Sequence, residues 1–225
     1  MSSGHGSVVV TATPAEPASD VTSTRRLPPR DFFARPTVEV ARELLGMIVS
    51  RATADGLTAG RIVETEAYAG PADLASHARA GATRRTAPMF GPVGHAYVYL
   101  VYGMHECLNV VARADGEAAG AVLLRAIEPL AGIELMRRRR GRPNDAAARL
   151  GAGPARLCQA LAVTRAHDGH DLLAGSELWL SAGPQPPSPT QIASGPRIGV
   201  GYAGEDWSRR PWRFWLAGHP SVSRR

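Results

Sequence analysis

The chain has 225 residues and a mass of 23.8 kDa, which is enough for one large domain or two small ones with an ordinary core. Its formal net charge is +6, its pI is near 10.1, and all 26 basic residues are arginines, so an acidic partner is favoured. Because the chain has no lysine, chemistry through a lysine Schiff base is excluded.

The sequence predicts a soluble, cytoplasmic protein with no membrane partner. No apolar run approaches the roughly 20 residues that span a bilayer, and the N-terminus lacks a basic start followed by a long apolar stretch. Cys107 and Cys158 lie far apart and show no zinc-ligand spacing, so neither a disulfide framework nor a zinc site is indicated.

The N-terminal part divides into a tail and a first helix. Residues 1–28 are rich in Ser, Thr, Ala and Pro, which predicts a disordered tail, and residues 29–225 are expected to form one folded domain. Pro36 and Thr37, followed by Glu39 and by apolar residues at helical spacing up to Gly46, predict a capped amphipathic helix.

The rest of the chain alternates strand-like and helix-like segments. Strands are predicted at 47–51, 61–68, 95–101, 108–112, 121–127, 178–181, 197–200 and 212–216, and helices at 130–139 and 154–161. Residues 69–94 and the proline-rich residues 183–196 are predicted to be exposed loops. This order favours an α+β fold, a single mixed domain with a curved, largely antiparallel sheet and packed helices.

The run RIVETEAYAG at residues 61–70 carries an acidic and aromatic face. In an extended strand Glu64, Glu66 and Tyr68 point to one side, while Val63 and its alternate neighbours point to the other. Paired carboxylates serve general acid–base catalysis, and burial beside a like charge raises the pKa of one of them. The alternative is that both carboxylates form structural ion pairs with arginines.

The run AYVYLVYGMHECLNV at residues 96–110 predicts a hairpin rich in tyrosine. Tyr97 and Tyr99 share a strand face, whereas Tyr102 precedes Gly103, where a turn would direct Tyr102 and Met104 outward. Two interpretations remain: core packing, or an exposed wedge of the kind that fills the gap left by a nucleotide extruded from a duplex.

Three further polar residues are candidates for a site. His77 lies in the loop after the acidic strand, where it is either a hydrogen-bond partner near Glu66 or a surface residue. Asn109 alternates with apolar neighbours, so it points into a pocket or is a satisfied core residue. Arg125 follows an aliphatic run, and such a charge requires a buried carboxylate or an anionic ligand.

Two charged motifs are given structural interpretations. HDGHD at residues 167–171 has the composition of a metal cluster, but its spacing does not force the ligands onto one face, so no metal is expected. RRRRGR at residues 137–142 ends a predicted helix, where cations favour the helix dipole, and is interpreted as a solvated patch with non-specific affinity for phosphate.

Taken together, these segments resemble the alkyladenine or 3-methyladenine DNA glycosylases of the mammalian type, here as a bacterial member. The resemblance covers nearly all residues from about 30 onward, in family order. The matching stretches are ARELLG (41–46), GRIVETEAYAGPADLASH (60–77), YVYLVYGMHECLNV (97–110), AVLLRAIEPLAGIELM (121–136), GPARLCQAL (153–161) and RIGVGYAGE (197–205).

The resemblance assigns roles to the candidate residues. It implies that Glu66 is the general base that activates water, that Tyr68 and His77 flank the flipped base, and that Tyr99 closes the other side. It also implies that Tyr102, on a protruding hairpin, intercalates where the damaged nucleotide left the stack.

Further roles concern specificity and DNA contacts. The resemblance implies that Asn109 excludes the exocyclic amine of ordinary guanine, and that Met104 and Arg125 lie at the DNA near the wedge. His105 and Glu106 depart from better-known members, which carry aromatic residues there, so the groove lining is expected to differ.

The implied function is that of a monofunctional DNA glycosylase in base excision repair. It would act as a monomer, without a cofactor, on double-stranded DNA that contains damaged purines, at the nucleoid in the cytoplasm. Three alternatives remain: a non-catalytic damaged-DNA-binding protein, a metal-dependent hydrolase that uses HDGHD, and a carbohydrate hydrolase. The sequence leaves the range among alkylated, deaminated and etheno purines open.

Overall fold

The computed structural model describes residues 26–223, so most of the predicted tail lies outside the described residues. Eight strands form one sheet in which every pair is antiparallel, which confirms the predicted α+β fold. Six follow the order β3-β4-β5-β2-β1-β6, while β8 pairs with β2 and β7 with β8. The strands are β1 (Ile48–Thr53), β2 (Gly56–Tyr68), β3 (Ala96–Val101), β4 (His105–Val111), β5 (Ala121–Ala131), β6 (Leu178–Ser181), β7 (Ile192–Gly195) and β8 (Arg213–Leu216).

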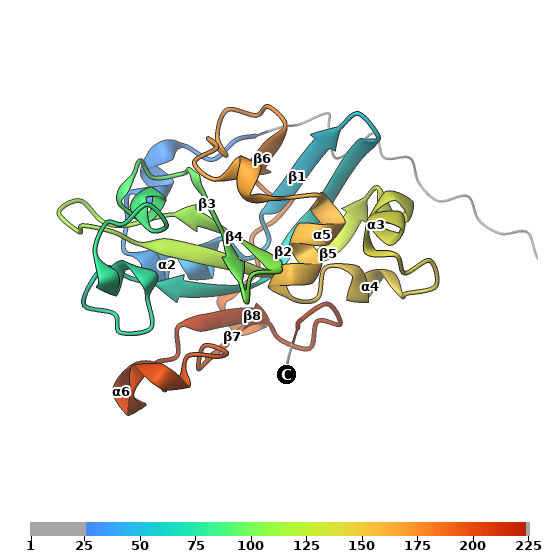
Figure 1. The fold of residues 1–225 in the computed structure, drawn as a ribbon. Coiled ribbons are helices and arrows are strands. Elements are labelled where there is room, and N and C mark those ends of the chain that lie inside the picture. The colour runs from blue at the N-terminus through green and yellow to red at the C-terminus, as the bar shows by residue number, and fades with distance from the viewer. Residues whose placement is uncertain (1–25, 224–225) are drawn as a thin grey trace, which may run out of the picture.

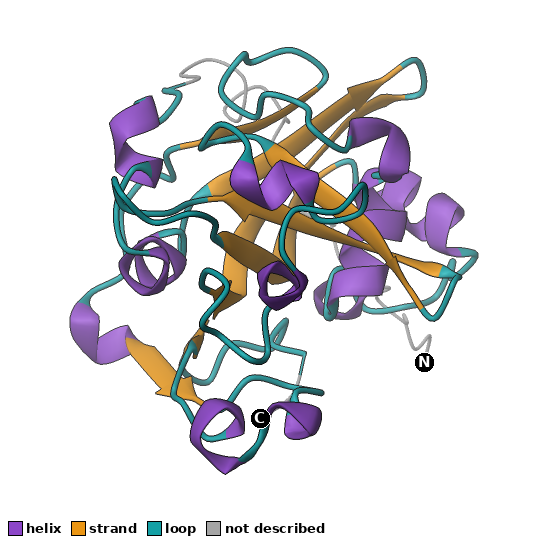
Figure 2. Ribbon diagram, turned by 60° about the vertical axis from the view of Figure 1, so that its left-hand side comes forward, coloured by secondary structure: helices purple, strands orange, loops and turns teal. Residues whose placement is uncertain are grey.

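Helices surround the strands, which cross the middle of the molecule (Figures 1 and 2). Within the described residues, none of the helices is long and apolar enough to span a membrane. The α-helices are α2 (Thr37–Glu43), α3 (Ile133–Arg140), α4 (Ala147–Leu150), α5 (Pro154–Leu161) and α6 (Glu205–Ser208). The 3-10 helices are η1 (Arg30–Phe33), η2 (His77–Ala80), η3 (Ala87–Phe90), η4 (Arg165–His167), η5 (Pro189–Gln191) and η6 (Gly201–Ala203).

The main core lies on one face of the sheet. Helix α2 packs against β2 and β5, and α5 packs against β4 and β5. Leu44, the C-cap of α2, and Leu157 of α5 are fully buried in this core together with Leu108 and Leu124 of the sheet. Because strand side chains alternate between faces, the neighbours of Leu108 and Leu124 in β4 and β5 point to the opposite face.

Strand β2 is paired on both of its edges. Strand β5 runs along one edge, from Ala59 to Tyr68 of β2. The other edge is shared, because β1 pairs with β2 up to Arg61 and β8 pairs with it from Glu64 to Glu66. Irregular pairing with β5 occurs on both sides of Glu64. The two carboxylates of the acidic strand therefore lie inside the sheet and not at an edge.

Two segments near the C-terminus differ from the prediction. The strand predicted at residues 197–200 is wrong: these residues form a turn with Gly199 at φ +80°, and the amide of Ile198 bonds a side chain instead of a neighbouring strand. The predicted loop at 183–196 contains β7, which pairs with β8. In Figure 1, β7, β8 and α6 lie together below the rest of the sheet.

The predicted helices are present, with corrections at their starts. The helix predicted from residue 130 begins at Ile133, because Ala131 still pairs with Ala59 of β2. Helix α2 begins at Thr37, but among the described residues its first turn receives no side-chain cap, because the hydroxyl of Thr37 donates to the carbonyl of Ala112 at 2.8 Å.

Candidate active site

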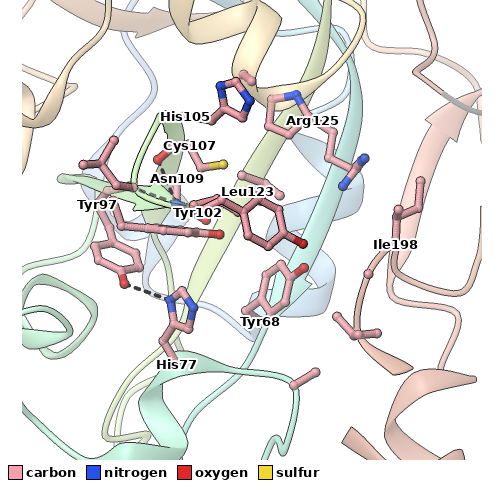
Figure 3. Close-up of a pocket in the computed structure, with 18 of the residues that line it drawn as sticks. Tyr68, His77, Tyr97, Tyr102, His105, Cys107, Asn109, Leu123, Arg125 and Ile198 are labelled. Atoms are coloured by element: carbon pink, nitrogen blue, oxygen red, sulfur yellow. Dashed lines mark hydrogen bonds between the residues drawn. The ribbon is translucent and has the colours of Figure 1, made fainter. Parts of the chain in front are cut away.

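A cavity of about 590 Å³ opens on the side of β3, β4 and β5 that faces away from the main core. Residues at alternate positions of these strands line it, as the pleat requires. Its other walls come from the loop after β2, the start of α5 and the turn at residues 198–202. Figure 3 shows polar and aromatic side chains converging on this space, among them Tyr68, His77, Tyr97, Tyr102, His105, Cys107, Asn109 and Arg125. Tyr99 and Ile198 also line the cavity.

Glu66 lies directly behind the wall of the cavity. Its side chain is 0% exposed, and all three of its hydrogen-bond or ion-pair partners line the cavity. The Tyr68 hydroxyl donates to Oε2 at 2.8 Å, the Ile198 amide donates to Oε1 at 2.7 Å, and Arg125 Nη1 lies 3.3 Å from Oε1. Burial raises the pKa of Glu66, and Arg125 and the two donors only partly oppose this rise.

Arg125 bridges the two carboxylates of the acidic strand. Its Nε donates to Glu64 Oε1 at 3.2 Å, while its Nη1 pairs with Glu66. Glu64 also accepts from Arg213 Nε at 2.7 Å and from the Ser223 amide at 2.7 Å. Burial by itself would lower the pKa of Arg125, but Glu66 and Glu64 outweigh it, so the pKa is raised and the guanidinium stays charged. Glu64 is therefore a structural partner for two arginines.

Three aromatic rings pack together in the wall of the cavity. Tyr97 and Tyr99 lie with ring centroids 5.2 Å apart, and His77 meets Tyr99 edge to face at 4.6 Å. His77 Nδ1 is 3.0 Å from the Tyr97 hydroxyl, so its partner is this phenol and not Glu66 (Figure 3). Burial, together with Arg85 and Arg79, lowers the pKa of His77 to about 4, so its ring is neutral at physiological pH.

Asn109 and Cys107 form the floor of the cavity on β4. Asn109 is 2% exposed, and its amide donates to the carbonyls of Tyr97 at 2.9 Å and Cys107 at 3.4 Å. Both prior interpretations of Asn109 therefore hold together: it is satisfied by the backbone and it lines the pocket. Burial raises the pKa of the Cys107 thiol to about 11, so this thiol is not a nucleophile at neutral pH.

The β3–β4 hairpin carries two exposed apolar residues at its turn. Tyr102 is 88% exposed and Met104 is 67% exposed, so the core-packing alternative is wrong for both. Tyr102 has φ +53° and Gly103 has φ +70°, a pair of left-handed residues that reverses the chain between β3 and β4. A tyrosine in this region is strained relative to glycine, which makes it a marker for function.

Most of the predicted site residues are brought together. Tyr68, His77, Tyr99, Tyr102, Asn109 and Arg125 line the cavity, and Glu66 contacts three of its wall residues. Met104 lies at the hairpin turn, outside the described lining. The structure thus assembles, from segments far apart in sequence, the set of residues that the resemblance selected.

Some residues of the site were not predicted. Tyr97 shares a strand face with Tyr99, and that alternation was a sufficient signal to include it. The Ile198 amide carries no side-chain signal, because any residue except proline supplies the same donor. Asp73 and Arg197 form a bidentate pair with N–O distances of 2.6 and 2.9 Å. Because 124 residues separate them in the sequence, no local pattern could predict the pair.

The HDGHD segment fixes a loop against the sheet. Asp168 accepts from the Val98 amide at 2.9 Å, and Asp171 pairs with Arg30 at 2.7 Å. His167 completes a capping box with Thr164. Within residues 26–223, no group of three or more His, Cys, Asp or Glu side chains is placed to hold a metal ion.

The arginine run ends α3, as predicted, with Gly141 at its C-cap. It is only partly a solvated patch, however. Arg139 donates to the Thr53 hydroxyl at 2.8 Å and to the Ala160 carbonyl at 3.2 Å, so it ties α3 to β1 and α5.

Comparison with known proteins identifies the family. The family described as methylpurine-DNA glycosylase matches residues 31–220. A relative from Methanocella arvoryzae is 50% identical over 197 residues, covering 88% of this chain and 96% of the relative. The human protein named DNA-3-methyladenine glycosylase is 44% identical over 202 residues, covering 86% of this chain and 66% of its own, and its mouse counterpart is 46% identical. The chain belongs to the methylpurine-DNA glycosylase family.

Proposed function

We propose that the protein is a monofunctional DNA glycosylase that hydrolyses the N-glycosidic bond of alkylated purines flipped out of duplex DNA. The observation that carries the proposal is the buried carboxylate of Glu66 behind a cavity lined by aromatic rings. The cavity's volume of about 590 Å³ is in the range of small-molecule sites and accommodates a purine nucleoside. The human and mouse relatives are named for the same activity.

The first step is extrusion of the damaged nucleotide. A base inside a duplex is out of reach of the cavity, and extrusion costs about a few kcal/mol in unstacking. Tyr102 and Met104 project from the hairpin at the mouth of the cavity, where an apolar wedge can fill the gap in the stack. The arginine-only basic surface, with a net charge of +6, attracts the phosphate backbone.

The second step is capture of the base between aromatic faces. Tyr68, His77 and Tyr99 all line the cavity, and the His77 ring meets the Tyr99 ring edge to face. Alkylated purines such as 3-methyladenine are cationic, and stacking on phenol rings stabilises a cation by about 0.5 to 2 kcal/mol. His77 suits this step because it is neutral and does not repel the charge.

Asn109 supplies the selection against normal purines. Its side chain is held by two backbone carbonyls and has no freedom to move out of the cavity floor. Because its amide nitrogen already donates to the backbone, this side chain is fixed in place and would crowd the exocyclic 2-amine of guanine. Guanine is thereby excluded, whereas purines without that amine fit.

The third step is hydrolysis. Glu66 takes a proton from a water that attacks the anomeric carbon, and its negative charge stabilises the oxocarbenium character of the sugar. Arg125 partly opposes the rise in the pKa of Glu66 that burial causes, and so favours the ionised form. The cationic base leaves readily, and because the chain has no lysine for a Schiff base, the product is an abasic site.

The test uses an oligonucleotide duplex with one alkylated purine, incubated with the protein and then treated with hot alkali. Strand cleavage only after alkali is expected, because base removal precedes cleavage and the protein has no lyase activity. The Glu66→Gln variant should bind the duplex but release the base at least 100-fold more slowly, as about 10²–10⁴-fold is typical for loss of a general base. Unchanged release by this variant would instead favour a site without base catalysis by Glu66.

A further inference from the structure

A buried ion pair lies behind the Tyr68 ring. Asp73 and Arg197 both have side chains that are 0% exposed, and they form a bidentate pair at 2.6 and 2.9 Å. Asp73 also accepts from the amides of Ala69 and Ala75 at 3.1 and 3.0 Å. The pair is therefore fixed by backbone contacts on its acidic side as well as by its own two bonds.

Arg197 is placed against the face of Tyr68. Its guanidinium carbon lies 4.9 Å from the Tyr68 ring centroid and 5.0 Å from the Trp212 ring centroid, so it is held between the two rings. Arg197 is buried and lies outside the described cavity lining, whereas Tyr68 belongs to that lining. One face of Tyr68 is thus covered by a cation, and the face toward the cavity is left for a ligand.

A cation behind the ring affects what can stack in front of it. A purine stacked on Tyr68 would have its ring centre about 4.5 Å away, so the Arg197 guanidinium carbon, 4.9 Å behind the ring, would lie roughly 9 Å from the base. At that distance and an effective dielectric constant of about 20, a full charge on the base changes binding by roughly tenfold or more. Asp73 pairs with Arg197 through both of its carboxylate oxygens and offsets most of this repulsion.

We propose that the Asp73–Arg197 pair sets the selectivity between cationic and neutral damaged bases. This inference rests on the proposed function, in which Tyr68 stacks on the flipped base. With Asp73 in place, Arg197 can contact Tyr68 and Trp212 without repelling a cationic base such as 3-methyladenine. Neutral bases such as hypoxanthine interact only weakly with either charge. The pair therefore changes the ratio between binding of cationic bases and binding of neutral bases.

The experiment measures single-turnover base release from two duplexes that differ only in one lesion, 3-methyladenine or hypoxanthine. The quantity compared is the enzyme concentration at half-maximal rate for each duplex, because charge on the base changes binding before the bond breaks. The ratio of the two values, taken on one enzyme preparation, is insensitive to the fraction of active protein. It therefore separates a charge effect from partial unfolding.

The two single variants should move this ratio in opposite directions. Asp73→Asn leaves the charge of Arg197 uncompensated. It should weaken binding of the duplex with the cationic base by roughly tenfold relative to the duplex with the neutral base. Arg197→Gln removes the charge that repels a cationic base. It should strengthen binding of the duplex with the cationic base, relative to the duplex with the neutral base, by a similar factor. The control Arg197→Lys keeps the charge, so both duplexes should weaken equally and the ratio should stay within about twofold.

The double variant Asp73→Asn/Arg197→Gln serves if a single variant does not fold, because it leaves no buried charge unpaired. Its ratio should return to within about twofold of that of the unmodified protein and should differ from that of whichever single variant folds, because both charges are removed together. Ratios that stay constant across the variants would overturn the inference while leaving the proposed function intact. Absence of base release from both duplexes by the unmodified protein would instead refute the proposed function.

Discussion

Replacing Glu64 by Gln tests the idea that this residue holds the site together without acting on substrate. Glu64 is 0% exposed, and its carboxylate receives Arg125 at 3.2 Å, Arg213 at 2.7 Å and the Ser223 amide at 2.7 Å. Glutamine keeps the shape and one acceptor oxygen, but it removes the negative charge between two guanidinium groups. The substitution therefore isolates the electrostatic contribution of Glu64 to the stability of the fold.

The expected loss is large compared with the stability of a domain of this size. Removing one partner of a buried ion pair costs about 3 to 5 kcal/mol, because the other charge stays buried and unpaired. Arg125 retains Glu66 as a partner, so the lower part of this range is expected, about 3 kcal/mol. Domains are stable by only about 5 to 15 kcal/mol, so the variant should remain folded but with much less margin.

The assay is urea denaturation followed by tryptophan fluorescence, with Glu134→Gln as the matched control. Glu134 also pairs with an arginine, Arg137, but its side chain is 73% exposed, so its loss should cost less than about 1 kcal/mol. A loss for Glu64→Gln that equals the control would refute the argument that burial makes this pair indispensable.

Three further predictions follow from single side chains. Arg125→Met should move the acid limb of the pH–rate profile to higher pH, because Arg125 opposes the rise in the pKa of Glu66 and the base must be ionised to act. Tyr102→Gly should greatly reduce base release but leave the free energy of unfolding within about 1 kcal/mol, because glycine relieves the positive φ of an exposed residue; a large loss of stability would contradict this. In an NMR titration His77 should have a midpoint near 4, and its contribution to stability should be lost as the pH falls from 6.5 toward that value, since the unfolded chain takes up the proton first.

Period-2 alternation predicted much of the site. It placed Glu64 and Glu66 on one face, where Arg125 reaches both, and Tyr97 beside Tyr99. These predictions succeeded because strand geometry is local and the pleat has a fixed period. The glycine after Tyr102 indicated a turn, but the sequence left core packing and an exposed wedge both open for this ring, and its 88% exposure decided between them.

The long-range pairings could not be predicted in this way. Ile198 donates to Glu66 across 132 positions, and nothing in its own residue type identifies a backbone donor. Strand β7 has the sequence IASG, whose low strand propensity is overruled by its pairing with β8. The role of each site residue in catalysis came from the family resemblance, because the residue types and spacing alone also allowed structural ion pairs.

The contacts along the second edge of β2 have a consequence for folding during synthesis. The groups that satisfy the two carboxylates from that side, Ile198, Arg213 and Ser223, all belong to the last part of the chain. Synthesis on the ribosome proceeds from the N-terminus, so β2 emerges long before these partners exist. A nascent chain, or one shortened by a late stop codon, would carry Glu64 and Glu66 but would lack these three partners of their carboxylates.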